Sequence, residues 1–215
     1  MAFRPSVPSG SNARPPAINL PPLTLALLAA MTIIHVGLAL APAEFERLGV
    51  MYFSFIPAAY LAEGWPFWSL LVAPFSYALL HGGFGHLVLN GVMLAVMGQV
   101  LERRLGPGGF LLLFAAGAAG GALVHFMIGG APRVPLIGAS AGVGGLYGAG
   151  LVLHRRGVYL GPNTRLLVVL AGLFIIMNLL GLVLPILSDI AYAAHLGGFI
   201  AGALVAARLT PARRV

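Results

Sequence analysis

Four polar side chains interrupt long apolar stretches of the chain: Ser140, His195, His86 and Asn90. A serine hydroxyl becomes a useful nucleophile when a histidine takes its proton, and the imidazole titrates near neutral pH. A carboxamide, a second imidazole and a backbone N–H can stabilise a tetrahedral oxyanion. These residue types indicate acyl-transfer chemistry, with Ser140 as nucleophile, His195 as general base, and His86, Asn90 and the Ser140 N–H as oxyanion donors. No carboxylate accompanies them, so the predicted catalytic unit is a Ser-His dyad.

The ionisable residues do not fit metal-dependent hydrolysis, aspartyl proteolysis or ion-coupled transport. There is no His-Glu-x-x-His motif, Asp189 is the only aspartate, and the chain has no cysteine. A zinc protease, an aspartyl protease and a thiolate metal site are thereby excluded, and we expect neither a metal nor a cofactor. An ion-coupled transporter usually carries charges near the middle of the membrane, whereas every acid here lies at the end of an apolar run or in a loop.

The composition indicates which elements must position these groups. Of the 215 residues, 60% are hydrophobic and only 8% are charged. A soluble domain of this size could not bury so much apolar surface, so we predict an all-α membrane protein. The net charge of +7 is carried by arginines in short loops and tails rather than along one face, and therefore predicts no nucleic-acid partner.

Apolar runs of about 20 residues, the length of a bilayer crossing, predict a six-transmembrane-helix bundle. The predicted spans are 22–42, 84–102, 108–128, 136–154, 164–186 and 190–208. We expect the membrane domain to cover residues 20–210, between a disordered cytoplasmic tail over 1–19 and a short basic tail over 211–215.

The distribution of arginine predicts the orientation. An even number of spans places both termini on one side, together with the connections 103–107 and 155–163. That side collects Arg4, Arg14, Arg103, Arg104, Arg155, Arg156, Arg165, Arg208, Arg213 and Arg214, and the other side holds only Arg47 and Arg133. Because positive charge favours the cytoplasm, we predict a multi-pass protein of the inner (plasma) membrane with both termini cytoplasmic.

A long segment, 43–82, separates the first two spans and contains ten aromatic residues, including both tryptophans. Aromatic side chains at this density favour the membrane–water interface. We therefore expect a folded element in the outer leaflet, which controls access to the bundle from the side, rather than an ordinary periplasmic loop.

The predicted orientation brings the polar groups to one depth. Ser140 alone would be interpreted as a packing residue, since a small hydroxyl can bond to its own backbone. However, His86, Asn90, Ser140 and His195 all lie within the first turns of spans that start at the outer surface, and His86 and Asn90 share a helix face. Small residues beside Ser140 and His195 predict close helix packing; they are Gly138, Gly142, Ala194, Gly198 and Gly202. Four polar residues at other positions are interpreted as isolated: His35, His125, His154 and Asn178.

Three sequence motifs in these spans, in this order, resemble the rhomboid family of intramembrane serine proteases. They are "HGGFGHLVLN" at 81–90, "GAS" at 138–140 and "AHLGGFIAG" at 194–202, and "LERRLG" at 101–106 is also similar to the family. The resemblance covers about residues 22–208. It implies six helices with an outer-leaflet loop after the first, Ser140 and His195 as the catalytic pair, and His86 and Asn90 as oxyanion donors. His81 matches the first histidine of the family's second span, and with Gly138 it is expected to have an accessory role.

Three positions depart from the family's usual residues. The glycine that follows the nucleophile is replaced by Ala141, and the tyrosine that stacks on the catalytic histidine is replaced by Gly144. Tyr147 and Tyr192 are the candidate substitutes for that ring. In the long segment the usual Trp-Arg pair is Trp68-Ser69.

The function predicted from the sequence is hydrolysis of a peptide bond in or near the transmembrane segment of another membrane protein. The expected partners are such substrates and membrane lipids. The sequence does not predict the identity of the substrate or the oligomeric state. Two alternatives stay open: a catalytically inactive rhomboid-like binder of membrane proteins, and a small-solute channel or transporter.

Overall fold

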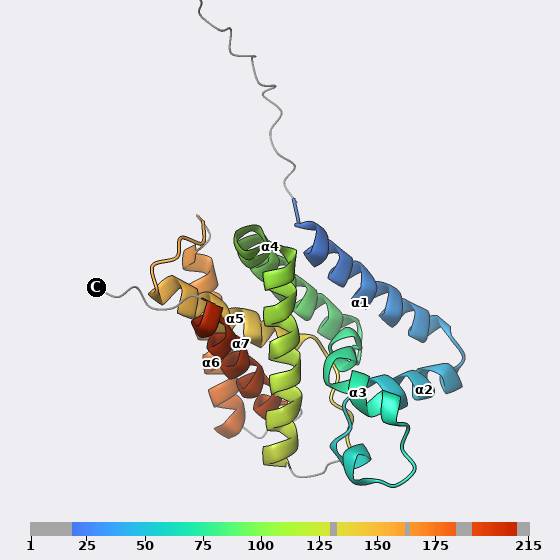
Figure 1. Ribbon diagram of the computed structural model, residues 1–215. Coiled ribbons are helices and arrows are strands. Elements are labelled where there is room, and N and C mark those ends of the chain that lie inside the picture. The colour runs from blue at the N-terminus through green and yellow to red at the C-terminus, as the bar shows by residue number, and fades with distance from the viewer. Residues whose placement is uncertain (1–18, 130–132, 162–163, 184–190, 210–215) are drawn as a thin grey trace, which may run out of the picture.

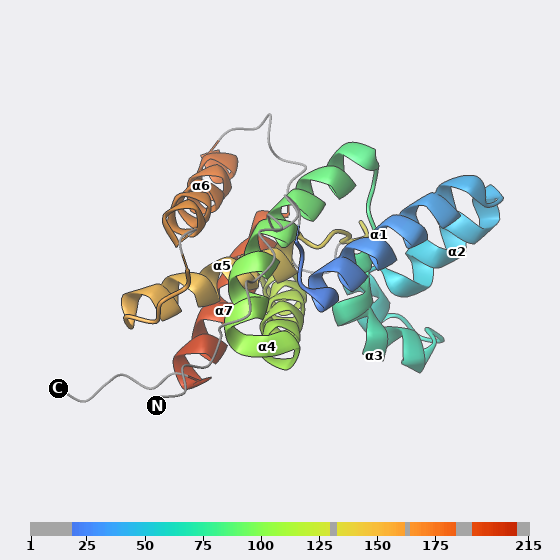
Figure 2. The same cartoon turned by 90° about the horizontal axis from the view of Figure 1, so that it is seen from above.

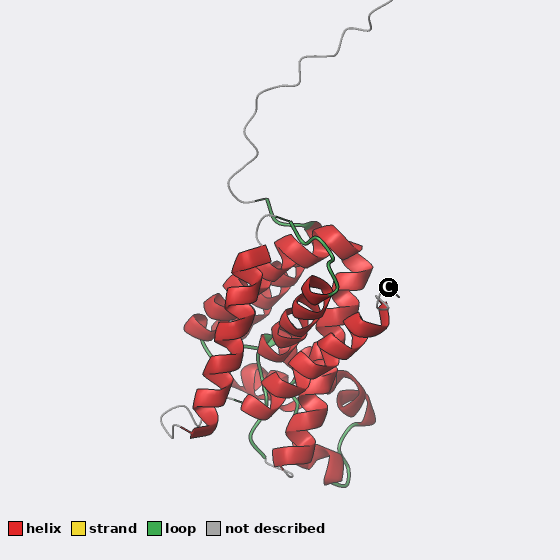
Figure 3. Ribbon diagram, turned by 90° about the vertical axis from the view of Figure 1, so that its left-hand side faces the viewer, coloured by secondary structure: helices red, strands yellow, loops and turns green. Residues whose placement is uncertain are grey.

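The computed structural model describes residues 19–129, 133–161, 164–183 and 191–209. Over these ranges every regular element is a helix, and the helices are joined by loops (Figure 3). The tail expected to be disordered, apart from Asn19, lies outside the described residues, as do the short basic tail and Asp189. The all-helical prediction is confirmed for the part of the chain that the structure describes.

Five elements correspond to the predicted spans: α1 (Pro22–Leu40), α4 (Phe84–Gly129), α5 (Ser140–Arg155), α6 (Thr164–Val183) and α7 (Tyr192–Leu209). Within the described residues, three helices are long and apolar enough to cross a membrane, namely α1, α4 and α7. The chain is thus a helical membrane protein. The number of spans stays a prediction, because α5 has only 16 residues and the part of α6 whose side chains the structure describes is limited to Thr164–Leu180.

The helix α4 is interrupted at Gly106, whose backbone has φ 73° and ψ 171°. A positive φ is easily adopted by glycine, and the Pro107 that follows has no N–H to continue the hydrogen-bond ladder. The two halves of α4 therefore correspond to the predicted spans 84–102 and 108–128.

The start of α1 is held by a buried carboxylate from α4. The Glu102 side chain, 4% exposed, accepts hydrogen bonds from the backbone N–H groups of Leu23 and Thr24 at 2.9 and 2.7 Å. It also accepts one from the Thr24 hydroxyl at 2.7 Å. N–H groups in the first turn of a helix have no partner within the helix, and an anion there is further stabilised by the helix dipole. This residue of the "LERRLG" motif therefore joins α1 to α4.

The long segment between α1 and α4 is folded. It contains α2 (Ala43–Phe53), the short helix η1 (Pro57–Leu61), α3 (Phe67–Ser76) and the short helix η2 (Tyr77–Leu79). The buried Ser69 hydroxyl donates to the Tyr52 carbonyl at 2.7 Å, and the ring of Trp68 lies 5.6 Å from that of Tyr52. Ser69 thus ties α3 to α2. The position of this segment in the outer leaflet stays a prediction.

The helices α1, α2 and α3 lie on one side of α4, and α5, α6 and α7 lie on the other (Figures 1 and 2). The closest packing is between α5 and α7, where glycines let the backbones touch. A Cβ atom added at Gly198 would overlap the carbonyl of Ala141, and one at Gly202 would overlap Gly145. The predicted small-residue ridge of α7 is therefore confirmed, and it brings the N-terminal parts of α5 and α7 together.

Candidate active site

Ser140 and His195 face one another across the contact between α5 and α7. Ser140 is the first residue of α5, and His195 lies in the first turn of α7. The Ser140 Oγ lies 2.7 Å from the His195 Nε2. This is the geometry in which an imidazole can take the proton of a hydroxyl. The start of α5 also leaves N–H groups without partners in the helix, next to the hydroxyl.

His86 and Asn90 lie on one face of α4, as their spacing predicts. The Asn90 side chain is 1% exposed, and its Nδ2 donates to the His86 carbonyl at 3.1 Å. An amide nitrogen has two N–H groups, so this bond orients the carboxamide and leaves a second donor. Asn90 Oδ1 has no hydrogen-bond partner among the described residues.

All four predicted residues line one cavity of about 690 Å³. Its walls come from α4, α5, α6, α7 and the loop before α5, and its apolar lining includes Leu89, Met93, Val96, Leu173 and Met177. The volume is within the range of ligand-binding pockets, which is about 300–1,000 Å³. The structure therefore brings the four residues together, and their catalytic roles stay predictions.

Gly138 has a different setting from the one predicted. We expected it to form a small-residue ridge with Gly142 inside a span, but α5 begins at Ser140 and Gly138 lies in the preceding loop at φ 114°. A Cβ atom there would lie 2.6 Å from both the Cε1 and the Nε2 atoms of His86. Gly138 thus lets the backbone before Ser140 pass close to the Cε1 and Nε2 atoms of His86. Gly142 packs instead against the ring of Phe114 from α4.

His81 lies behind His86 and outside the main cavity. It is 8% exposed, and its ring meets that of His86 at 5.2 Å and 70°. Burial, together with the nearby His86, lowers the pKa of His81 to about 4, so this imidazole is neutral at pH 7. A second cavity of about 130 Å³ contacts His81, His35 and Glu46. Within the described residues, no group of three or more His, Cys, Asp or Glu side chains is arranged to hold a metal ion.

Two residues of α6 that the sequence analysis did not assign to the site contact His195. The Phe174 ring lies 5.4 Å from the imidazole at 45°, and the Asn178 Oδ1 lies 2.8 Å from the His195 Nδ1. The interpretation of Asn178 as isolated was therefore wrong. Its depth, eight residues or roughly 12 Å below the predicted outer end of its span, does not tell whether its side chain faces His195.

Phe174 also explains the departure at Gly144. A Cβ atom at Gly144 would lie 3.1 Å from the Phe174 ring and 3.2 Å from the His195 carbonyl oxygen. The space that a larger side chain would need is thus filled from α6. Tyr147, one of the two candidate substitutes, stacks on Phe174 at 5.3 Å, while Tyr192 lines the cavity.

The long segment is joined to the backbone just before Ser140. Phe55 and Leu136 exchange two backbone hydrogen bonds, of 3.1 and 2.9 Å, and the Gly138 N–H donates to the Tyr77 carbonyl at 2.9 Å. The Tyr77 hydroxyl reaches the Ala118 carbonyl of α4 at 2.9 Å. A displacement of this segment would therefore move the backbone at the start of α5.

Comparison with known proteins gives a consistent set of relatives. The Rhomboid domain family matches residues 65–212. The chain is 30% identical over 140 residues to YdcA of Bacillus subtilis (strain 168), covering 64% of this chain and 65% of that protein. It is 34% identical over 145 residues to the rhomboid protease GluP of the same organism, covering 66% of this chain and 26% of GluP. RHOMBOID-like protein 5 of Arabidopsis thaliana is 34% identical over 125 residues, covering 57% of this chain and 39% of that protein. The match thus spans just under two thirds of YdcA and about a quarter of GluP.

Proposed function

The chain belongs to the rhomboid family, and from this premise we propose that it is an intramembrane serine protease. It hydrolyses a peptide bond in or near the transmembrane segment of other membrane proteins. The observation that carries the proposal is the 2.7 Å contact between Ser140 Oγ and His195 Nε2, at the wall of an apolar cavity that His86 and Asn90 also line.

The first half of the reaction forms an acyl-enzyme. His195 Nε2 takes the hydroxyl proton of Ser140 while Oγ attacks the carbonyl carbon of the substrate. The carbonyl oxygen becomes an oxyanion, which the free N–H of Asn90, the His86 ring and the Ser140 backbone N–H stabilise. The tetrahedral intermediate then collapses, the C–N bond breaks, and the imidazolium of His195 gives its proton to the leaving amine.

The second half of the reaction hydrolyses the ester on Ser140. His195 takes a proton from a water molecule, whose oxygen attacks the acyl carbon. The oxyanion donors act again, and the intermediate collapses with cleavage of the bond to Oγ. His195 returns its proton to Ser140, and the carboxylic acid product leaves.

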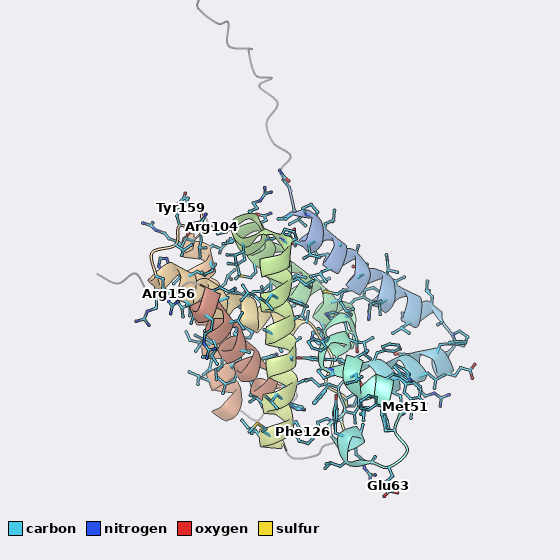
Figure 4. All side chains as sticks on the ribbon, viewed as in Figure 1. Met51, Glu63, Arg104, Phe126, Arg156 and Tyr159 are labelled. Atoms are coloured by element: carbon cyan, nitrogen blue, oxygen red, sulfur yellow. The ribbon has the colours of Figure 1, made fainter. Side chains whose placement is uncertain are left out.

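We further propose that the chain crosses a bacterial-type inner membrane six times. Both termini then lie on the cytoplasmic side, and the segment 43–82 lies in the outer leaflet. Arg104 and Arg156 lie in the half of the molecule where α1 begins, and Glu63 lies at the opposite end (Figure 4). The position of these arginines supports the orientation, because positive side chains favour the cytoplasmic side. Ser140 starts the helix that ends near Arg156, so the proposed orientation puts the site toward the outer surface, where water reaches it.

The competing function is binding of membrane proteins without cleavage, as in an inactive rhomboid-like protein. It is favoured because Ala141 and Gly144 replace the glycine and the tyrosine that the family usually has at these positions. The experiment that separates the two is incubation of the purified protein with a panel of transmembrane substrates, beside the Ser140→Ala variant. We expect cleavage by the unmodified protein alone. Capture of a substrate without cleavage by either protein would favour the binder.

A further inference from the structure

The amide of Asn178 is held by hydrogen bonds at both of its polar atoms. Its Nδ2 donates to the Phe174 carbonyl, one turn earlier in α6, at 2.7 Å. Its Oδ1 lies 2.8 Å from the His195 Nδ1. Because a backbone carbonyl can only accept, the Phe174 carbonyl fixes which end of the amide is the nitrogen. The end that faces His195 is therefore the oxygen.

This orientation determines the tautomer of His195. An amide oxygen only accepts hydrogen bonds, so the Nδ1 of His195 must carry a proton. A neutral imidazole with its proton on Nδ1 has a bare Nε2, and that nitrogen faces the Ser140 hydroxyl at 2.7 Å. The hydrogen bonds then run in one direction, from Ser140 through His195 and Asn178 to the backbone of α6.

We infer that Asn178 is a positioning residue that holds His195 in the tautomer and orientation a general base requires. The inference rests on the proposed protease function, and it makes the unit a Ser140–His195–Asn178 triad in place of the dyad predicted from the sequence. Asn178 acts only through His195. When His195 takes the serine proton, its Nδ1–H keeps donating to Oδ1, and the hydrogen bond is strengthened by the charge on the imidazolium.

The setting favours an amide over the carboxylate that other serine hydrolases use in this place. Asn178 lines a cavity with a mostly apolar wall, on a helix that otherwise carries apolar residues around it. An ionised carboxylate there would lose its hydration with only a histidine as partner, at a high cost in free energy. A neutral amide provides the same acceptor atom without that cost. The Phe174 ring, which lies 5.4 Å from the His195 imidazole at 45°, restricts the rotation of the imidazole.

The test compares two substitutions that separate shape from hydrogen bonding. Asn178→Leu keeps a side chain of similar size but removes the acceptor, whereas Asn178→Asp keeps an acceptor oxygen in either protonation state. We expect Asn178→Leu to lower kcat by about 10- to 100-fold with little change in KM, as the loss of a hydrogen bond to a charged group would. Asn178→Asp should recover most of that loss, because a carboxyl group that stays neutral in this apolar setting can donate to the Phe174 carbonyl and still accept from the His195 Nδ1. Leu179→Ala is the control, since Leu179 is the next residue, is 57% exposed and lies outside the cavity lining.

A second readout does not depend on turnover. In the ¹⁵N spectrum of the purified protein in lipid nanodiscs, the His195 signals are assigned by their loss in His195→Gln. We expect the proton on Nδ1 at pH 7, and a mixture of tautomers in Asn178→Leu. A proton on Nε2 in the unmodified protein would overturn the inference. So would a kcat in Asn178→Leu equal to that of the unmodified protein, or an Asn178→Asp variant as slow as Asn178→Leu.

These results are distinguishable from a failure of the proposed function. If the unmodified protein cleaves no substrate and Ser140 resists a serine-directed probe, the protease proposal is wrong, and the tautomer of His195 still decides whether Asn178 positions the ring. If cleavage depends on Ser140 but not on Asn178, only the inference about Asn178 is wrong.

Discussion

Replacing Gly138 with alanine should slow catalysis strongly while leaving most of the fold in place. The substitution has two costs, which the structure separates. The backbone at Gly138 has φ 114°, which an L-residue adopts at a cost of about 1–3 kcal/mol. The new Cβ would also lie 2.6 Å from two atoms of the His86 ring. Ordinary contacts between carbon atoms are roughly 3.5–4.0 Å, so the ring or the backbone before Ser140 must move by about 1 Å.

That displacement falls between the predicted nucleophile and a predicted oxyanion donor. A misplacement of about 1 Å in a catalytic constellation can cost about 100-fold in rate. We therefore expect Gly138→Ala to lower kcat by about 10²-fold and the free energy of unfolding by about 1–3 kcal/mol. The assay measures cleavage of a transmembrane substrate, with Tm recorded on the same preparation.

Gly85→Ala is the matched control for this experiment. Gly85 is adjacent to His86 in the sequence and lies in α4. Apart from its chain neighbours and the backbone of its own helix, no atom lies within 4 Å of the position that a new Cβ would take. It should keep the rate and Tm of the unmodified protein. If Gly138→Ala kept full activity, the close approach between Gly138 and His86 would have no part in catalysis, and the reasoning from the cavity geometry would be refuted.

Three further substitutions test other parts of the account. Asn90→Ala should lower turnover by about 10²–10³-fold with an unchanged Tm, because it removes an oxyanion donor; an unchanged rate would remove Asn90 from the mechanism. Trp68→Ala should change cleavage of a transmembrane substrate and of a small soluble ester by different factors, if the segment 43–82 controls lateral access; equal factors with an unchanged Tm would show that it does not. Glu102→Ala should lower the free energy of unfolding by about 1–3 kcal/mol, measured by denaturation in detergent, because three donors at the start of α1, two of them buried, lose their acceptor; an unchanged stability would refute the capping role.

The sequence was sufficient to predict which polar residues of α4, α5 and α7 come together. The helix rise fixes the depth of a side chain once the direction of its span is known, and His86, Asn90, Ser140 and His195 were found in this way. Their small neighbours also indicated close approach, as the contacts of Gly198 and Gly202 with α5 bear out. Depth follows from the position of a residue within its span, and size follows from the residue type, so both can be obtained from the sequence.

The contacts of α6 could not be predicted in the same way. Whether Asn178 and Phe174 reach His195 depends on the rotation of α6 about its own axis and on its tilt. Apart from Asn178, its residues from Leu166 to Val183 offer no polar side chain that would mark one face as inward. The sequence also placed Gly138 inside a helix, because the apolar run is continuous there, whereas the hydrogen bond from its N–H to Tyr77 belongs to a loop.

The central claim is that Ser140 is a nucleophile activated by His195, and labelling with a fluorophosphonate probe tests it most directly. The protein is labelled in its folded, detergent-solubilised form. It is then digested, and the adduct is located by mass spectrometry. We expect one modified residue, Ser140, with no labelling of Ser140→Ala and strongly reduced labelling of His195→Gln. Equal labelling of the unmodified protein and Ser140→Ala, or an adduct on another residue, would contradict it.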